Sequence, residues 1–269
     1  MYSSALGSLA ALLYLATGAW LGVRLARTGQ AHQPGKLGAL FIGLAALALH
    51  TLVLGQTVVL PTGLNLAFFN ALSLSGWLMA VLLLGASLVR PLENVGIVLL
   101  PFCAASVALA LVFPATRIVA EARQWRIELH VVVSILAYAL LSLAAVQSLL
   151  LAVQERRLRS RHAGGFIRGF PPLVTMEALL FQMIGIGFAA LTLALISGFL
   201  FLDDIFAQHL VHKTVLSIAA WLVFGTLLWG RARFGWRGRT AIRWTLGGFL
   251  VLVLAYFGSK LVLELVLRR

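Results

Sequence analysis

The sequence predicts an all-α fold: a polytopic membrane helix bundle with about eight transmembrane helices. Of its 269 residues, 61% are hydrophobic and only 11% are charged, and the mean hydropathy is +1.01. One soluble core cannot bury that much apolar surface. The chain also lacks the alternating pattern of a membrane β-barrel. We therefore expect a single transmembrane domain over residues 1–269.

Eight apolar runs are long enough, at ~17–25 residues, to cross a bilayer as helices. They cover residues 5–23, 37–60, 64–89, 95–113, 129–153, 179–201, 214–229 and 246–267. The first run has no basic residues ahead of it, so we interpret it as a retained helix and not as a signal peptide. Pro61 and Gly63 predict a tight outer turn between the second and third runs. Asn65 and Asn70 follow in the third run. Their side chains are expected either to line a cavity or to form hydrogen bonds with neighbouring helices.

The net charge of +13 comes from 21 lysines and arginines against eight acids. Fourteen of the basic residues lie in odd-numbered loops or at the helix ends beside them: Arg24, Arg27, Lys36, Arg90, Arg156, Arg157, Arg159, Arg161, Arg168, Arg231, Arg233, Arg237, Arg239 and Arg243. The positive-inside rule places these loops in the cytoplasm and both termini outside, N-out and C-out. The charge thus indicates membrane topology, with lipid as a partner, and we expect no nucleic-acid partner.

Three of the six histidines lie in or beside apolar runs. His130 opens the fifth run and His212 directly precedes the seventh, so both are expected within about one turn, ~5 Å, of the same outer boundary. Their imidazoles can then meet across helices, or remain two interfacial side chains in water. His209 shares a face with His212 only if that helix begins early. His50 is expected ~15 Å below the outer end of the second run, as a ligand or as a neutral imidazole bonded to a neighbouring helix.

The outer loop before the fifth run carries Arg117, Arg123 and Arg126, on the face where positive charge is disfavoured. The segment is either an amphipathic interfacial segment with Trp125 as its anchor or a group of guanidiniums that holds ligand carboxylates. The chain has no P-loop, GxSxG, HExxH or GxGxxG motif, and its single cysteine, Cys103, excludes an intramolecular disulfide. We expect a protein that is not an enzyme.

Several short segments, in this order, are similar to one membrane-protein family. They are residues 64–66, 71–77, 128–139, 185–193, 197–198, 212–214, 221–224, 235–239 and 256–258. The chain resembles the integral-membrane cytochrome c assembly proteins of the CcsA, CcmC and HemX type, from about Leu64 to residue 267. The resemblance implies a bacterial inner-membrane protein of cytochrome complex biogenesis, with haem b as cofactor and other membrane proteins as partners.

If the haem implied by the resemblance is bound, the positions of His130 and His212 make them the expected iron ligands near the periplasmic face, with His50 and His209 as further candidates. Arg117, Arg123 and Arg126 would contact the haem propionates. Three features depart from the family pattern: residues 207–213 contain no tryptophan, Trp229 replaces a helical histidine, and no histidine follows Gly258. Two alternatives to haem binding are a haem-free structural or regulatory subunit and a small-anion transporter.

Overall fold

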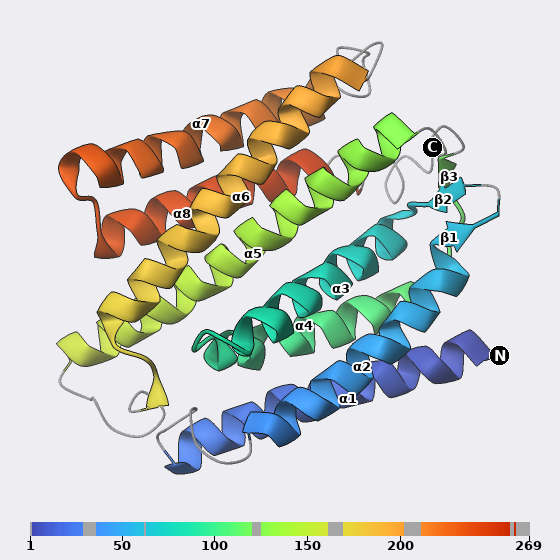
Figure 1. The fold of residues 1–269 in the computed structure, drawn as a ribbon, viewed down its shortest axis with the longest axis horizontal. Helices are drawn as coiled ribbons and strands as arrows, with labels where there is room; N and C mark the ends of the chain where they lie inside the picture. Colours follow the sequence, from blue (N-terminus) through green and yellow to red (C-terminus); the bar gives the residue numbers. More distant parts are fainter. Residues whose placement is uncertain are drawn as a thin grey trace. The chain divides into compact units, whose positions relative to one another are not determined.

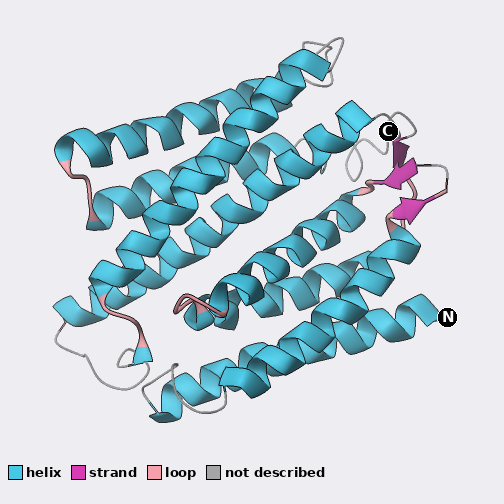
Figure 2. Cartoon of the chain, viewed as in Figure 1, coloured by secondary structure: helices cyan, strands magenta, loops and turns pink. Residues whose placement is uncertain are grey.

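The computed structural model describes residues 2–28, 36–61, 63–119, 125–160, 169–201, 211–258 and 261. Within these residues, eight helices are long and apolar enough to cross a membrane, as the sequence predicts (Figures 1 and 2). They are α1 (Tyr2–Thr28), α2 (Lys36–Thr57), α3 (Phe68–Ser87), α4 (Glu93–Val112), α5 (Trp125–Arg159), α6 (Leu173–Phe201), α7 (Val211–Phe234) and α8 (Gly238–Val253). The last continues as a π-helical turn, η3 (Leu254–Gly258). The polytopic helical fold is confirmed.

Three helix boundaries differ from the sequence prediction by six to eight residues, and one of them is the start of α6 at Leu173, six residues before the predicted start at residue 179. α8 begins at Gly238, eight residues before the predicted start at residue 246. α5 continues to Arg159, six residues past the predicted end at residue 153. The extra turns of α5 and α8 contain arginines. Arginine lowers the local hydropathy but favours the helical conformation, so the apolar run is shorter than the helix. In α5, the ion pair between Glu155 Oε1 and Arg159 Nη2, at 2.6 Å and one turn apart, supports the extra turns.

A small antiparallel sheet, which the sequence does not predict, lies among the described residues of the first half of the chain (Figure 2). Its strands, β1 (Val59–Leu60), β2 (Gly63–Asn65) and β3 (Ile118–Val119), are ordered β1-β2-β3. Leu60 pairs with Gly63, which confirms the predicted turn at Pro61. Gly63 has φ 139°, a conformation that favours glycine. Strands of two or three residues are too short to give a period-two signal.

The chain divides into two compact units, and the first contains Met1–Ala120 and Val153–Met176. In it, α1 packs along α2 and α4, and α3 packs along the same two helices. Tyr14, Met79 and Leu99 are among the fully buried side chains of its core. A Cβ on Gly18 would lie 2.9 Å from Pro101 Cδ, so the α1 and α4 backbones approach closely. Such small-residue contacts let helices associate inside a membrane.

The second unit contains Glu121–Ala152 and Glu177–Arg269. α7 packs on α8 and on η3. The Phe188 ring of α6 stacks on the Trp221 ring of α7, with centroids 5.5 Å apart, and Tyr138 of α5 meets Phe257 of η3 at 5.3 Å. A Cβ on Gly187 would lie 2.8 Å from Leu141 Cδ2, so α5 and α6 also pack closely.

Within the second unit, neighbouring helices run in opposite directions. Figure 1 shows that α5 begins, α6 ends and α7 begins at one end of the unit, which we call the His130 end. The turn between α7 and α8 lies at the opposite end. Most of the predicted site residues that the structure describes fall at the His130 end.

Candidate functional site

His130 lies on the second turn of α5 and faces the end of α6. Its Nδ1 is 2.9 Å from Ser197 Oγ. Its side chain is neither fully buried nor exposed. The hydrogen bond therefore fixes the ring against α6 while part of the imidazole stays accessible.

The contacts of the Ser197 hydroxyl favour a hydrogen on Nδ1 of His130. A hydroxyl has one hydrogen, and Ser197 donates it to the backbone oxygen of Ala194 at 3.0 Å. Its oxygen must therefore accept a hydrogen bond from Nδ1–H of His130. In a neutral imidazole this leaves the lone pair on Nε2. With the hydrogen on Nδ1, Nε2 has the lone pair that metal ligation needs.

Two further contacts shape the His130 end. A Cβ on Gly198 would lie 3.2 Å from His130 Cε1, so the glycine allows the imidazole to rest against the α6 backbone. The Trp125 ring, at the start of α5, meets the Phe201 ring, at the end of α6, in an edge contact with centroids 5.9 Å apart. These contacts join the start of α5 to the end of α6.

His212 lies on the first turn of α7, and its side chain is exposed. The predicted placement of His130 and His212 at the same end of their helices agrees with the direction of α5 and α7 in Figure 1. In the part of the chain that the structure describes, no hydrogen bond or ring contact joins the two imidazoles. Direct contact between the two imidazoles is not required, because each would bind the iron and not the other ring. His209 lies outside the described residues.

The three outer arginines differ in position. Arg126 lies one turn before His130 on α5, so the two side chains share a helix face. Its guanidinium lies 5.6 Å from the centre of the Trp125 ring and is exposed. Arg117 is exposed and belongs to the first unit, where its backbone N–H donates to Asn65 Oδ1 at 2.8 Å. Arg123 lies outside the described residues. Arg126 is thus the arginine whose position relative to His130 is known.

His50 is fully buried in the first unit, and both of its ring nitrogens have hydroxyl partners. Nε2 is 2.9 Å from Ser73 Oγ of α3. Nδ1 is 3.4 Å from the Tyr14 hydroxyl of α1. This arrangement fits the interpretation of a neutral imidazole bonded to neighbouring helices. To bind a metal, His50 would have to exchange one of these hydrogen bonds.

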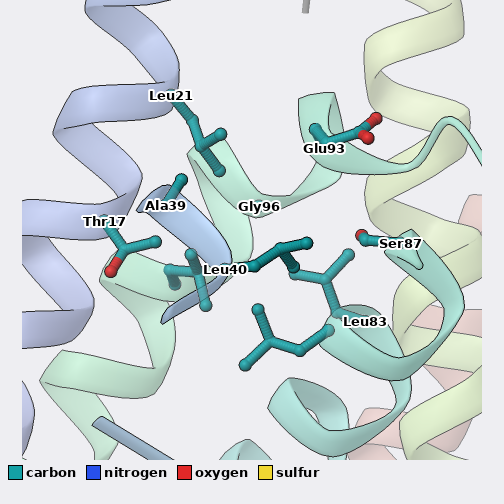
Figure 3. Close-up of a pocket in the computed structure, with 10 residues that line it drawn as sticks. Thr17, Leu21, Ala39, Leu40, Leu83, Ser87, Glu93 and Gly96 are labelled. Atoms are coloured by element: carbon teal, nitrogen blue, oxygen red, sulfur yellow. The ribbon is translucent and has the colours of Figure 1, made fainter. Parts of the chain in front are cut away.

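A small pocket in the first unit, shown in Figure 3, offers no alternative site for a macrocycle. It holds about one water molecule. Half of the residues that line it are leucines, and Thr17, Ser87 and Glu93 supply its polar groups. No group of three or more histidine, cysteine, aspartate or glutamate side chains in the described ranges could hold a metal ion. A haem iron would need only two protein ligands, and His130 and His212 would supply them.

Sequence reasoning identified His130 but not the residues that orient it. Ser197 entered only as part of a segment similar to the family. A serine followed by glycine is common where membrane helices pack, so the pair carries no specific signal. Only the fold shows that they lie beside His130, which is 67 residues earlier in the chain.

Comparison with known proteins supports the resemblance. The family model "Cytochrome C assembly protein" matches residues 39–267 and so includes α2 as well. "Inner membrane protein YpjD" of Escherichia coli (strain K12) is 32% identical over 235 residues, 85% of this chain and 87% of the relative. "Cytochrome c biogenesis protein CcsA" of Chlamydomonas reinhardtii is 28% identical over 139 residues, 51% of this chain and 38% of the relative.

The similarity extends beyond these two proteins. CcsA of Synechococcus sp. (strain CC9902) is 28% identical over 156 residues, 49% of this chain and 51% of the relative. No solved structure matches the chain. The family model covers most of the sequence, and the chain belongs to the cytochrome c assembly protein family as a multi-pass protein of the inner membrane.

Proposed function

We propose that the protein binds haem b and acts in the biogenesis of membrane or exported cytochromes. His130 and His212 are the proposed iron ligands, near the periplasmic face. The support from comparison is the family itself and relatives whose names include cytochrome c biogenesis. The proposed role is binding and transfer, not catalysis.

One observation carries the proposal: the contact between His130 and Ser197. Histidines that bind metals generally donate the other ring N–H to a fixed acceptor, which sets the tautomer and the ring orientation. Ser197 Oγ is such an acceptor for Nδ1. Nε2 is then the coordinating nitrogen. His130 thus has a partner that suits ligation, whereas each ring nitrogen of His50 has a partner of its own.

Each proposed residue has a distinct role. His130 would hold the iron in a fixed orientation, and the exposed His212 would supply the second imidazole from α7. Arg126, one turn from His130, would hold a propionate. Haem bound by two imidazoles supplies a low-spin iron that can be carried or can transfer an electron.

The absorption spectrum of freshly purified protein, with no haem added, tests the proposal. A Soret band with the visible bands of low-spin haem is the expected result. A protein that purifies colourless and does not take up added haem would favour the haem-free structural or regulatory subunit. Transport of a small anion, which rests on the outer arginines alone, would need a separate uptake assay.

The outer arginines are expected to improve haem retention. Replacing Arg117, Arg123 and Arg126 together by glutamine should lower the haem bound per protein, because guanidinium–carboxylate contacts are lost. Expression should not change. Arg126→Gln alone should account for most of the loss, since Arg126 shares the His130 face. Unchanged haem content, measured by pyridine haemochrome, would mean that these arginines are interfacial anchors only.

The proposed site requires the N-out, C-out orientation. A C-terminal alkaline phosphatase fusion should be active, because this enzyme folds only in the periplasm, whereas a C-terminal fluorescent protein that matures only in the cytoplasm should be dark. The arginines of the α7–α8 turn lie opposite the His130 end and so support this orientation. The reverse reporter pattern would place His130 and His212 on the cytoplasmic side and reject a periplasmic site.

A further inference from the structure

The turn between α7 and α8 concentrates positive charge. Five arginines lie in or beside it: Arg231, Arg233, Arg237, Arg239 and Arg243. Two acidic residues are described in the second unit. Glu128 lies at the His130 end, and Glu177 lies beside the turn. Among the described residues of the second unit, the carboxylate of Glu177 is thus the one acidic group near these five guanidiniums.

Glu177 holds the turn in place but offsets only part of its charge. Its Oε1 accepts hydrogen bonds from Arg231 Nη1 at 2.7 Å and Arg237 Nε at 3.0 Å. Arg231 Nη1 also donates to the Trp236 backbone oxygen at 3.2 Å, and its guanidinium lies 4.5 Å from the centre of the Phe181 ring. The Glu177 side chain is 10% exposed, whereas that of Arg237 is 57% exposed. Arg237 is therefore held by Nε while the rest of its guanidinium is available to a ligand.

A row of aromatic rings crosses the same turn. Trp229 meets Phe234 at 5.2 Å, Phe234 stacks on Trp236 at 6.3 Å, and Trp236 meets Trp244 at 5.4 Å, measured between ring centroids. Trp229 is 60% exposed and Phe234 is 61% exposed. Gly235, with φ 66°, allows the sharp reversal. Exposed tryptophans beside arginines are typical of the level of lipid headgroups.

We propose that this arginine–tryptophan turn (residues 229–244) binds an anionic phospholipid. Arg233, Arg237 and Arg243, all exposed, would contact the headgroup phosphate. The exposed rings of Trp229 and Phe234 would pack on the glycerol and upper acyl carbons. The helices on both sides are candidate membrane spans, so the turn lies at a membrane surface. A soluble phosphate would contact the arginines but not the aromatic rings. The presence of both arginines and exposed rings in one turn therefore favours a lipid.

Native mass spectrometry of the full chain in detergent tests this inference. The protein is mixed with dioleoyl phosphatidylglycerol or with zwitterionic dioleoyl phosphatidylcholine, and the bound lipid is counted. Wild type should prefer phosphatidylglycerol. The double variant Arg233→Gln with Arg243→Gln should weaken phosphatidylglycerol binding about 30-fold. Each arginine near anionic lipid contributes about fivefold, and the two factors multiply. This variant leaves the Glu177 contacts intact, so the turn should still fold.

Arg156→Gln with Arg157→Gln is the matched control. It removes the same charge from two exposed arginines at the end of α5, and it should keep the phosphatidylglycerol preference. Equal losses in the two variants would indicate attraction to net charge and would overturn the inference. Displacement of the lipid by millimolar inorganic phosphate, in wild type, would identify a soluble anion as the ligand. Arg237→Gln should also weaken binding, and a full wild-type preference there would contradict the assigned role of Arg237.

Discussion

Replacing His130 by alanine is expected to abolish the low-spin haem spectrum of the purified protein. His130 is the proposed ligand that a neighbouring helix orients, so its loss would remove one iron ligand and the orientation of the site. His212→Ala should have the same effect on spin state, because low-spin iron needs both imidazoles. His32→Ala and His162→Ala, which alter histidines outside the eight apolar runs of the sequence, should leave the spectrum unchanged.

A chemical rescue distinguishes a lost ligand from a misfolded protein. Added imidazole should restore the low-spin spectrum of His130→Gly, because it can occupy the space that the side chain leaves. A spectrum that is indifferent to substitution of both His130 and His212 would reject these ligands while leaving haem binding itself open to His50 or His209.

Ser197→Ala tests whether Ser197 orients the proposed ligand His130 through their hydrogen bond. Loss of such an orienting partner lowers metal affinity by about 10–100-fold. Haem should therefore dissociate more readily, with the low-spin form still visible at saturation. Ser142→Ala is the matched control on α5, because the Ser142 hydroxyl donates to the Tyr138 backbone oxygen within its own helix. Equal haem retention in the two variants would contradict the orienting role of Ser197.

The second large effect is expected at Asn65, which joins the sheet to the helices of the first unit. Its Nδ2 donates to the backbone oxygens of Thr57 and Ala115, both at 3.1 Å. Its Oδ1 accepts from the backbone N–H of Arg117 at 2.8 Å and of Ala67 at 3.4 Å. Asn65→Ala leaves these groups without the amide partner, which should cost on the order of 3 kcal/mol. The melting temperature in detergent should fall by roughly 10 °C.

Asn70→Ala provides the comparison, since it removes the same kind of side chain from a neighbouring buried position. Asn70 has one long hydrogen bond, 3.5 Å to the Ala115 backbone oxygen. Its loss should lower the melting temperature by much less. Asn65→Asp keeps the acceptor but removes the Nδ2 donors. Its melting temperature should therefore lie between those of Asn65→Ala and Asn70→Ala. Similar melting temperatures for the two alanine variants would mean that Asn65 does not join the sheet to the helices.

Hydropathy predicted the helices well because a membrane span needs a long apolar run, and each described span shows one. It placed the start of α8 too late, since Arg239 and Arg243 lie within its first two turns. It also missed the sheet. Pro61 and Gly63 marked the chain reversal, but the pairing of Asn65 with Ile118 joins residues far apart in sequence. Local pattern carries no information about such pairing.

In the candidate site, too, the sequence predicted what depends on neighbouring residues and missed what depends on contacts between helices. Position at a helix start sufficed to predict that His130 and His212 lie at one end of their unit. The sequence could not tell that His50 has two hydroxyl partners, because Tyr14 and Ser73 come from other helices. It could not find Ser197 either, for the same reason. Hydrogen-bond partners across helices depend on helix rotation, which hydropathy does not specify.

The three-stranded sheet also locates the edge of the hydrocarbon layer. Open sheet edges leave backbone N–H and C=O groups unpaired, and lipid tails cannot satisfy these groups. The short strands β1 and β3 are the edges here, so the sheet must lie in the headgroup region or in water. α2 ends at Thr57, beside the sheet, and His50 lies seven residues earlier, about 10 Å into the hydrocarbon. The imidazole of His50 is thus closer to the sheet-side surface than to the opposite one, and a lipid-borne quencher placed near the headgroups would probe the Tyr14 ring that contacts it.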